Sequence, residues 1–203
     1  MRDTSIQQLL SNGQLGYILP QNQGEANQII RVSTELNKLE WANSAQNISC
    51  RVYSSTNIVV PGATGIDTPG NIIIPRDSVR FNYGNIYDPA NPTRLTAPVK
   101  GIYSIFSTIN VSASPSKKWF LLDVNDTVTI GCITQDVNYP AGTNFDMTLT
   151  CFNVNVLFEL NVGDYVETRY VNFSTDSDVI QQQTKPNFYH NNEFGMALLF
   201  ETL

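Results

Sequence analysis

The chain has 203 residues, long enough for one sizeable β domain plus an extension. Only 15% of the residues are charged, and 18 acidic residues against 12 basic ones give a formal net charge of -6. A composition without clustered Lys and Arg argues against nucleic-acid binding. The chain also lacks the ~20-residue apolar run of a membrane span and the apolar core of a secretory signal. We therefore expect a soluble protein that binds no nucleic acid, does not insert into a membrane and is not exported by a standard signal.

Residues 1–45 show no pattern sufficient for a hydrophobic core of their own. A short helix is expected over residues 2–12, with Thr4 or Ser5 as its N-cap. It is too short to be stable alone. The stretch that follows has glycines and a proline at its turns but only brief apolar pairs, so something else must bury it.

A second feature of this N-terminal part is a set of short motifs. They are Leu19-Pro20, Gly24, the run Asn27-Gln28-Ile29-Ile30 and the closing Leu39-Glu40-Trp41. The set resembles the neck repeat of phage and large-virus fibre proteins, which typically precedes a trimeric head.

The neck resemblance has a physical logic. One extended chain cannot bury Ile29, Ile30, Leu39 and Trp41, whereas three chains wound about an axis cover them mutually. We predict a docking segment and trimerisation neck over residues 1–45, with these four residues at a trimer interface. A strand packed on its own head domain is the alternative.

From residue 46 onward, strand patterns recur about every 10–15 residues and no helical period is sustained. The clearest strand follows Pro98 and Gly101, with Tyr103, Ile105, Ile109 and Val111 on one face. Gly101 indicates a position where backbone conformation or close approach excludes a side chain. Residues 119–130 are predicted to form a hairpin that turns at Asn125-Asp126.

Two later segments complete the predicted domain. Gly163-Asp164 should turn the chain into a strand over residues 165–173, in which Glu167, Thr168 and Arg169 are expected at solvent or an interface. The final strand is apolar on both faces and should therefore lie centrally in its sheet. The fold class is all-β, a jelly-roll or Greek-key sandwich over residues 46–203.

Several motifs in this domain occur in a particular order. They are Val79-Arg80-Phe81, then Asn85 and Tyr87-Asp88, then residues 95–103 (LTAPVKGIY), then residues 160–166 (LNVGDYV), then Phe194-Gly195 near Leu198-Leu199-Phe200. Together they resemble the globular head of complement component 1q and its tumour-necrosis-factor-like relatives. The sequence departs from that pattern at Ile105 and Ser107, where the family usually carries aromatic residues.

This resemblance implies a jelly roll of the tumour-necrosis-factor-like type that assembles as a homotrimer. The inner sheet of such a head buries aromatic and apolar residues at the three-fold axis. Tyr103 and Phe194 are the interface candidates that it suggests, with packing in the core of one chain as the alternative.

The sequence offers little catalytic chemistry. Its one histidine, His190, lies in an Asn-rich loop, and the three cysteines Cys50, Cys132 and Cys151 form no Cys-x-x-Cys pair, so reduced thiols are expected. Glu159, Glu167 and Asp164 could form a carboxylate pair for glycoside hydrolysis, but nothing singles them out. We predict no enzyme activity and no cofactor.

Metal binding has only weak support. Asp123-x-Asn125 and Asp176-x-Asp178 have spacings that suit oxygen ligands of calcium, and Asp176 and Asp178 are the better pair. Neither continues into a full ligand loop, and turns use Asp and Asn for local hydrogen bonds.

These observations favour a non-enzymatic virion surface protein that is the trimeric head of a fibre, of a spike or of a decoration protein. It would be made in the host cytoplasm, would dock to other virion proteins through its N-terminal segment and would serve host attachment or particle decoration. The alternatives are the trimeric head of a cellular collagen-like filament on an extracellular surface, and a capsid-cementing protein without a receptor.

A host glycan or protein, if bound, is expected at loops 61–70, 82–93, 135–145 and 174–192. These are rich in Asn, Gly, Thr and Tyr, which provide adaptable hydrogen bonds and flat aromatic surface. Tyr83, Tyr139 and Tyr189 are the candidate ligand-binding residues. The alternative is that each packs against its own loop or a neighbouring subunit.

Overall fold

The computed structural model describes residues 28–32, 38–43, 48–65, 68–138, 149–182 and 192–202. The chain divides into two compact units, Met1–Gln46 and Asn47–Leu203. Within the described residues, no helix has the length and apolar character needed to cross a membrane.

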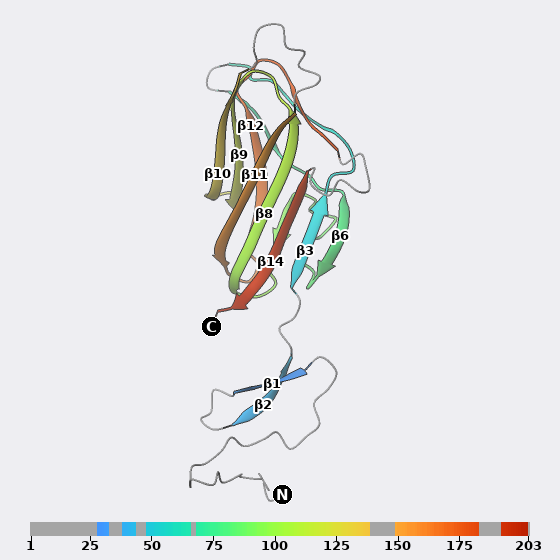
Figure 1. Cartoon of the computed structure of the whole chain (residues 1–203), viewed down its shortest axis with the longest axis vertical. Coiled ribbons are helices and arrows are strands. Elements are labelled where there is room, and N and C mark those ends of the chain that lie inside the picture. The colour runs from blue at the N-terminus through green and yellow to red at the C-terminus, as the bar shows by residue number, and fades with distance from the viewer. Residues whose placement is uncertain are drawn as a thin grey trace, which may run out of the picture. The chain divides into compact units, whose positions relative to one another are not determined.

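The first unit contains an antiparallel hairpin of β1 (Gln28–Val32) and β2 (Leu39–Asn43) (Figure 1). Its register places Ile30 opposite Trp41 and Val32 opposite Leu39. Ile30 is 46% exposed and Leu39 is half-buried, so the hairpin leaves apolar surface uncovered. The predicted helix over residues 2–12 and the side chains of Ile29 and Trp41 lie outside the described residues.

The second unit, called the head below, is a β-sandwich. Its described strands are β3 (Ser49–Tyr53), β4 (Ile58–Val60), β5 (Gly70–Ile73), β6 (Ser78–Tyr83), β7 (Arg94–Thr96), β8 (Gly101–Ser112), β9 (Ser116–Val124), β10 (Val128–Val137), β11 (Leu149–Leu160), β12 (Tyr165–Asn172), β13 (Asp178–Ile180) and β14 (Glu193–Glu201). All their pairings are antiparallel.

These strands form a seven-stranded and a five-stranded sheet. In the seven-stranded sheet, β8 pairs with β11 along one edge and with β14 and β13 along the other; β3 and β6 continue beyond β14, and β4 lies beyond β13. In the five-stranded sheet the order is β10-β9-β12, and β5 and β7 share the far edge of β12. The all-β two-sheet sandwich predicted from the sequence is confirmed.

The core lies between the two sheets because the long strands alternate in burial. Along β8 every second residue is buried, beginning at Gly101, and Tyr103, Ile105, Ile109 and Val111 are fully buried. Phe152 of β11 contacts Tyr170 of β12 edge-on, with ring centroids 5.6 Å apart, and so joins the two sheets. The face predicted for the strand after Gly101 is therefore correct.

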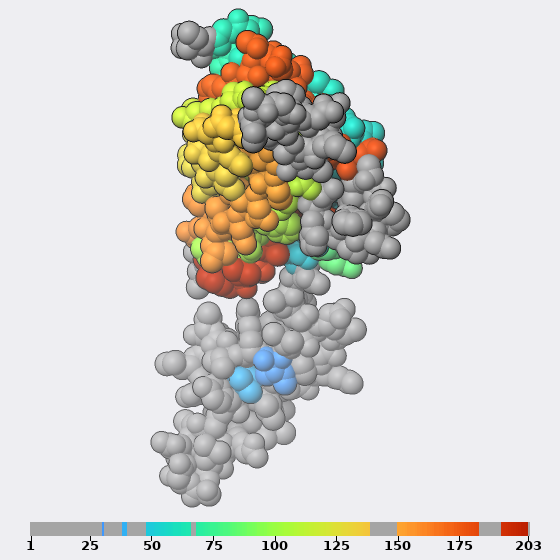
Figure 2. Space-filling view, turned by 45° about the horizontal axis from the view of Figure 1, so that its top comes forward, coloured from blue at the N-terminus to red at the C-terminus, as the bar shows by residue number. Residues whose placement is uncertain are grey.

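Strands β10 and β11 close one edge of the sandwich, as the yellow and orange surfaces show (Figure 2). Gly131 of β10 allows this approach, since a Cβ there would lie 2.9 Å from Val154 Cγ2 and 3.0 Å from Val156 Cγ1. A similar close contact explains Gly101, where a Cβ would lie 2.6 Å from the Phe200 carbonyl oxygen.

The predicted turns occur where local sequence requires them. Asn125 and Asp126 have φ of 51° and 57°, which suits a tight hairpin because Asn and Asp tolerate the left-handed region. Gly163 has φ of 87° before β12. The last strand, β14, lies between β8 and β3 as predicted. A register shift between Leu198 and Phe200 interrupts its pairing with β8, and Leu199 and Phe200 near its end are 52% and 58% exposed.

Candidate functional site

The outward face of the seven-stranded sheet carries an apolar surface, here called the β8 face. The strand registers define two adjacent rows of residues that point away from the core. One row is Leu157, Ser104, Ala197, Ser49 and Tyr83; the other is Asn155, Phe106, Gly195, Arg51 and Phe81. Leu157 is 65% exposed and Tyr83 is 55% exposed, and small residues separate them. Along this first row the face is therefore flat in its middle, with an apolar side chain at each edge.

Two aromatic arrangements shape this face. The rings of Phe81 and Tyr83 stack on the edge strand β6, with centroids 5.7 Å apart. Phe106 lies against Gly195, where a Cβ would be 2.3 Å from the Phe106 ring. The Arg51 guanidinium lies 5.6 Å from the centroid of the same ring.

A buried carboxylate anchors three strands next to these rows. Glu193 of β14 is 1% exposed and accepts hydrogen bonds from Arg51 Nε of β3 at 2.8 Å and Arg80 Nε of β6 at 2.6 Å. Arg80 also lies 4.9 Å from the ring centroid of Tyr53. Charge-assisted bonds of this kind hold the edge strand in register.

The interface candidates Tyr103 and Phe194 require correction. They lie on β8 and β14, but their side chains are 0% and 1% exposed and face the core of a single chain. Tyr103 donates its hydroxyl proton to the carbonyl of Val99 at 2.7 Å. Side chains alternate along a strand, so the outward residues are their neighbours Ser104, Phe106 and Gly195.

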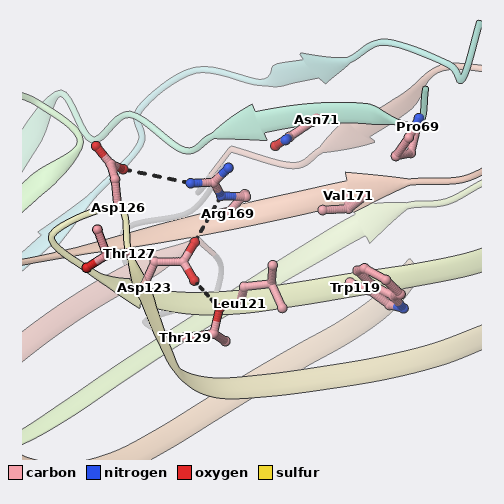
Figure 3. A pocket seen from close by; sticks show the side chains of 10 residues that line it. All are labelled: Pro69, Asn71, Trp119, Leu121, Asp123, Asp126, Thr127, Thr129, Arg169 and Val171. Carbon is pink, nitrogen blue, oxygen red and sulfur yellow. Dashed lines mark hydrogen bonds and ion pairs between the residues drawn. The ribbon is translucent and has the colours of Figure 1, made fainter. Parts of the chain in front are cut away.

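A second feature is a hollow on the outward face of the five-stranded sheet, here called the β9 hollow (Figure 3). It has a volume of about 340 Å³. Its lining consists of Pro69, Asn71, Trp119, Leu121, Asp123, Asp126, Thr127, Thr129, Arg169 and Val171. Arg169 Nε donates to Asp123 Oδ2 at 2.9 Å, and its NH2 lies 3.7 Å from Asp126 Oδ1. Thr129 Oγ1 donates to Asp123 Oδ1 at 2.6 Å.

A polar network continues from the hollow along β12. Glu167 Oε1 accepts from Arg94 Nε at 2.9 Å and from Thr93 Oγ1 at 2.8 Å. Tyr165 donates its hydroxyl proton to Asp126 Oδ2 at 3.1 Å, and the Arg94 guanidinium lies 3.9 Å from the Tyr165 ring centroid.

One carboxyl of this network, that of Glu167, has a raised pKa. Burial raises the pKa of Glu167, and hydrogen bonding with Asp126 raises it further; the same hydrogen bond lowers the pKa of Asp126. The expectation that Glu167 and Thr168 face solvent or an interface is wrong, since they are 1% and 0% exposed.

The calcium candidates also require correction. Asp178 is fully buried and accepts from Ser114 N, Ser114 Oγ and the Tyr170 hydroxyl. Its Oδ2 lies 2.8 Å from Lys118 Nζ. With donors and a cation filling both oxygens, no position is left for a metal ion; Asp176 is exposed. Among the described residues, no group of three His, Cys, Asp or Glu side chains could hold a metal ion.

The remaining candidates form no common site among the described residues. Tyr83 is exposed on β6, whereas Tyr139, Tyr189 and His190 lie outside the described residues. The three suggested carboxylates each have partners of their own: Glu159 accepts from Thr202 Oγ1, Glu167 from Arg94 and Thr93, and Asp164 from Asn125 and Asn161. No hydrogen bond joins any two of them. All three cysteines are free; Cys50 is buried, which raises its pKa to about 12, and Cys132 and Cys151 are exposed.

Sequence reasoning missed the β9 hollow. The sequence pattern singles out Asp123 only as a possible calcium ligand and places Trp119 only in the hairpin predicted over residues 119–130. The available signal was the alternation of β9, which places Trp119, Leu121 and Asp123 together on the outward face.

Comparisons with known proteins support the fold. No family model matches the sequence, and no curated protein matches it. Among solved structures, the head is similar to Eiger TNF from S. frugiperda, with a TM-score of 0.53 and 13% identity over 78% of this chain and 96% of that chain.

Two further solved structures resemble this chain at lower scores. The globular domain of zebrafish complement 1qA protein gives a TM-score of 0.47 at 9% identity, covering 76% of this chain and 98% of that one. Murine APRIL gives 0.48 at 11% identity, covering 74% and 99%. The jelly roll of the tumour-necrosis-factor and complement 1q type, which the sequence motifs implied, is confirmed as the fold of the head.

Proposed function

We propose that this protein is a non-enzymatic, homotrimeric binding head on the surface of a virion, to which its N-terminal unit attaches it. The β8 face is the observation that carries the proposal. Leu157, Phe81 and Tyr83 are exposed there in a single chain. Apolar surface gathered on one sheet face is typical of an interaction site.

The layout of the β8 face favours a closed ring over a two-fold dimer. Leu157 lies on β11 at one edge of the face, and Phe81 and Tyr83 lie on β6 at the opposite edge. In a ring of three, every contact joins two different surfaces, one from each of the two neighbouring chains. Two distinct apolar edges satisfy this requirement, and the family resemblance implies the same three-fold arrangement.

The placement on a virion rests on the N-terminal unit. Its motifs resemble fibre necks, and its hairpin leaves Ile30 46% exposed. A separate unit of this kind suits a segment that docks to other virion proteins while the head faces outward. The polar, weakly charged surface suits contact with a host glycan or protein.

The assembly is tested by measuring the mass of the full chain in solution. We expect the mass of three chains at micromolar concentration, and a smaller mass for Leu157→Glu because a charge at the edge of the β8 face opposes burial. Val128→Glu is the matched control, since Val128 is 51% exposed on β10 of the other sheet. A single-chain mass for the unmodified protein overturns the trimer.

The virion location is tested with an antibody to the head and electron microscopy of particles and cells. Label on the outside of particles is the expected result. Label on cellular filaments would favour the collagen-like alternative. A head that is present in particles but inaccessible to the antibody would favour the cementing role.

A further inference from the structure

The β9 hollow has a flat apolar floor. Trp119, Leu121 and Val171 line it from two neighbouring strands, and the register places Val171 opposite Trp119. The Phe173 ring packs edge-to-face against the Trp119 ring, with centroids 4.8 Å apart and an interplanar angle of 66°. A supported aromatic ring beside two aliphatic side chains is suited to the C–H face of a sugar ring.

One end of the hollow carries polar groups that are already oriented. Asp123 orients Arg169 by accepting a hydrogen bond from its Nε, and Thr129 orients Asp123 by donating a hydrogen bond to it (Figure 3). Each carboxylate oxygen has a second lone pair, so Asp123 and Asp126 can accept from ligand hydroxyls. Asn71 is exposed at the rim and offers both a donor and an acceptor.

Charges of both signs surround the hollow, and the Lys117 ammonium lies 5.6 Å from the centroid of the Trp119 ring. Two carboxylates, of Asp123 and Asp126, face the guanidinium of Arg169, and Arg94 NH2 lies 3.7 Å from Asp126 Oδ2. An anionic ligand would approach the carboxylates, and a cationic ligand would approach the guanidinium groups. Each of these approaches brings like charges together, which is unfavourable. A neutral hydroxyl avoids this repulsion because it donates to a carboxylate and accepts from a guanidinium.

We propose that the β9 hollow binds a neutral, hydroxyl-rich sugar ring of a host-surface glycan. Its volume of about 340 Å³ suits one ring and part of a second. This proposal rests on the proposed function as a binding head and names the ligand class. It places the site on the outward face of one subunit, and not on the loops around Tyr83.

The test uses the full-length protein on an array of neutral and sialylated glycans, followed by calorimetric titration with the best neutral glycan. Trp119→Leu keeps the floor apolar but removes the aromatic ring, and Asn71→Asp adds charge at an exposed rim position. We expect each to weaken binding about tenfold or more, because one aromatic or polar contact has that effect. Thermal unfolding of each variant shows that the head is still folded.

Val59→Ala is the matched control, since Val59 is 62% exposed on β4 of the opposite sheet and lies in neither the β9 hollow nor the two rows of the β8 face. The expected result is unchanged glycan affinity. Binding that both hollow variants retain at unchanged affinity would overturn the inference. So would a preference for sialylated glycans, or no binding to any neutral glycan.

The mass measurement on the same preparation separates the two proposals. A trimer that binds no neutral glycan overturns the hollow as a site and leaves the assembly intact. A single chain that binds through the hollow overturns the assembly but supports the site, because the hollow lies within one subunit.

Discussion

Individual residues in the head show two ways of holding a buried charge. Lys118 and Asp178 are fully buried and form an ion pair, and Asn172 and Ser114 complete the coordination of the ammonium group. Arg76 is also 0% exposed but donates to neutral acceptors, among them the Ile74 carbonyl at 3.1 Å. Burial lowers the pKa of Arg76 to about 9. Because Lys118 depends on one counter-charge, the stability of the head should be sensitive to the loss of Asp178.

Asp178→Ala should destabilise the head by about 3–5 kcal/mol, because it leaves the Lys118 ammonium buried without its counter-charge. Chemical denaturation of both proteins measures this change. Asp176→Ala, at an exposed position two residues away, should change stability by less than about 0.5 kcal/mol. Equal effects of the two substitutions would contradict the role of the ion pair.

Glu167 should make stability depend on pH. Its pKa in the folded state is raised above the ordinary 4.5, so the native state holds more protons than the unfolded chain between these two values. The free energy of unfolding contributed by Glu167 is therefore fully present below 4.5 and falls as pH rises through the folded pKa. Glu167→Gln cannot lose a proton and still offers an amide to Asp126.

The measurement is the thermal midpoint of both proteins between about pH 4 and pH 7. The midpoint of Glu167→Gln minus that of the unmodified protein should become more positive as pH rises. Glu159→Gln is the control, since the side chain of Glu159 is 50% exposed on the other sheet. A difference that is independent of pH would refute the assignment.

At the level of elements, the paired strands β8 and β14 each carry a glycine at a position where a bulky neighbour leaves no room for a side chain. Gly101 of β8 lies under Leu198 and Phe200, and Gly195 of β14 lies under the Phe106 ring. The first contact lies at one end of the pair, and the second lies in the middle of the β8 face. Strand pairing and the shape of that face are therefore linked.

Gly195→Ala should destabilise the head by about 1–3 kcal/mol, because the added Cβ would overlap the Phe106 ring. Phe106→Ala removes that obstacle, so the double variant should be more stable than the sum of the two single effects indicates. Denaturation of all four proteins completes this cycle. Additive effects would show that the ring is not the obstacle.

At the scale of the whole molecule, the head and the N-terminal unit are separate bodies. The sandwich has its own core between two sheets, and the β1–β2 hairpin belongs to the other unit. A domain with its own core is expected to fold alone. The N-terminal unit is then expected to contribute to assembly rather than to the folding of the head.

A chain of residues 47–203 should therefore unfold cooperatively. Its thermal midpoint should be nearly that of the full chain when both are measured at a concentration low enough for single chains.

In the full chain, Ile29→Ala with Ile30→Ala, or Trp41→Ala, should lower the fraction of trimer and leave the head folded, because neck and head bury separate apolar surfaces. Circular dichroism and light scattering give the two readouts. An unfolded head fragment would disprove the first expectation, and unchanged trimer mass and midpoint in the neck variants would disprove the second.

The sequence by itself determined the features that depend on neighbouring residues. Period-two alternation identified β8 and its buried face, Asn125-Asp126 identified the hairpin turn between β9 and β10, and Gly163 identified the turn into β12. These features are local, because side-chain direction along a strand and the φ that a turn requires are properties of a few consecutive residues.

Only the tertiary structure decided which face of an ambiguous strand meets the core and which distant groups meet each other. The last strand is apolar on both sides, so its pattern could not show that Phe194 points inward and Gly195 outward. Glu167 has a polar side chain typical of the surface, but Arg94 and Thr93, more than 70 residues earlier, cover it. Asp178 likewise meets Lys118 only because the beginnings of β13 and β9 lie near each other. Such contacts depend on strand order, which no stretch of neighbouring residues encodes.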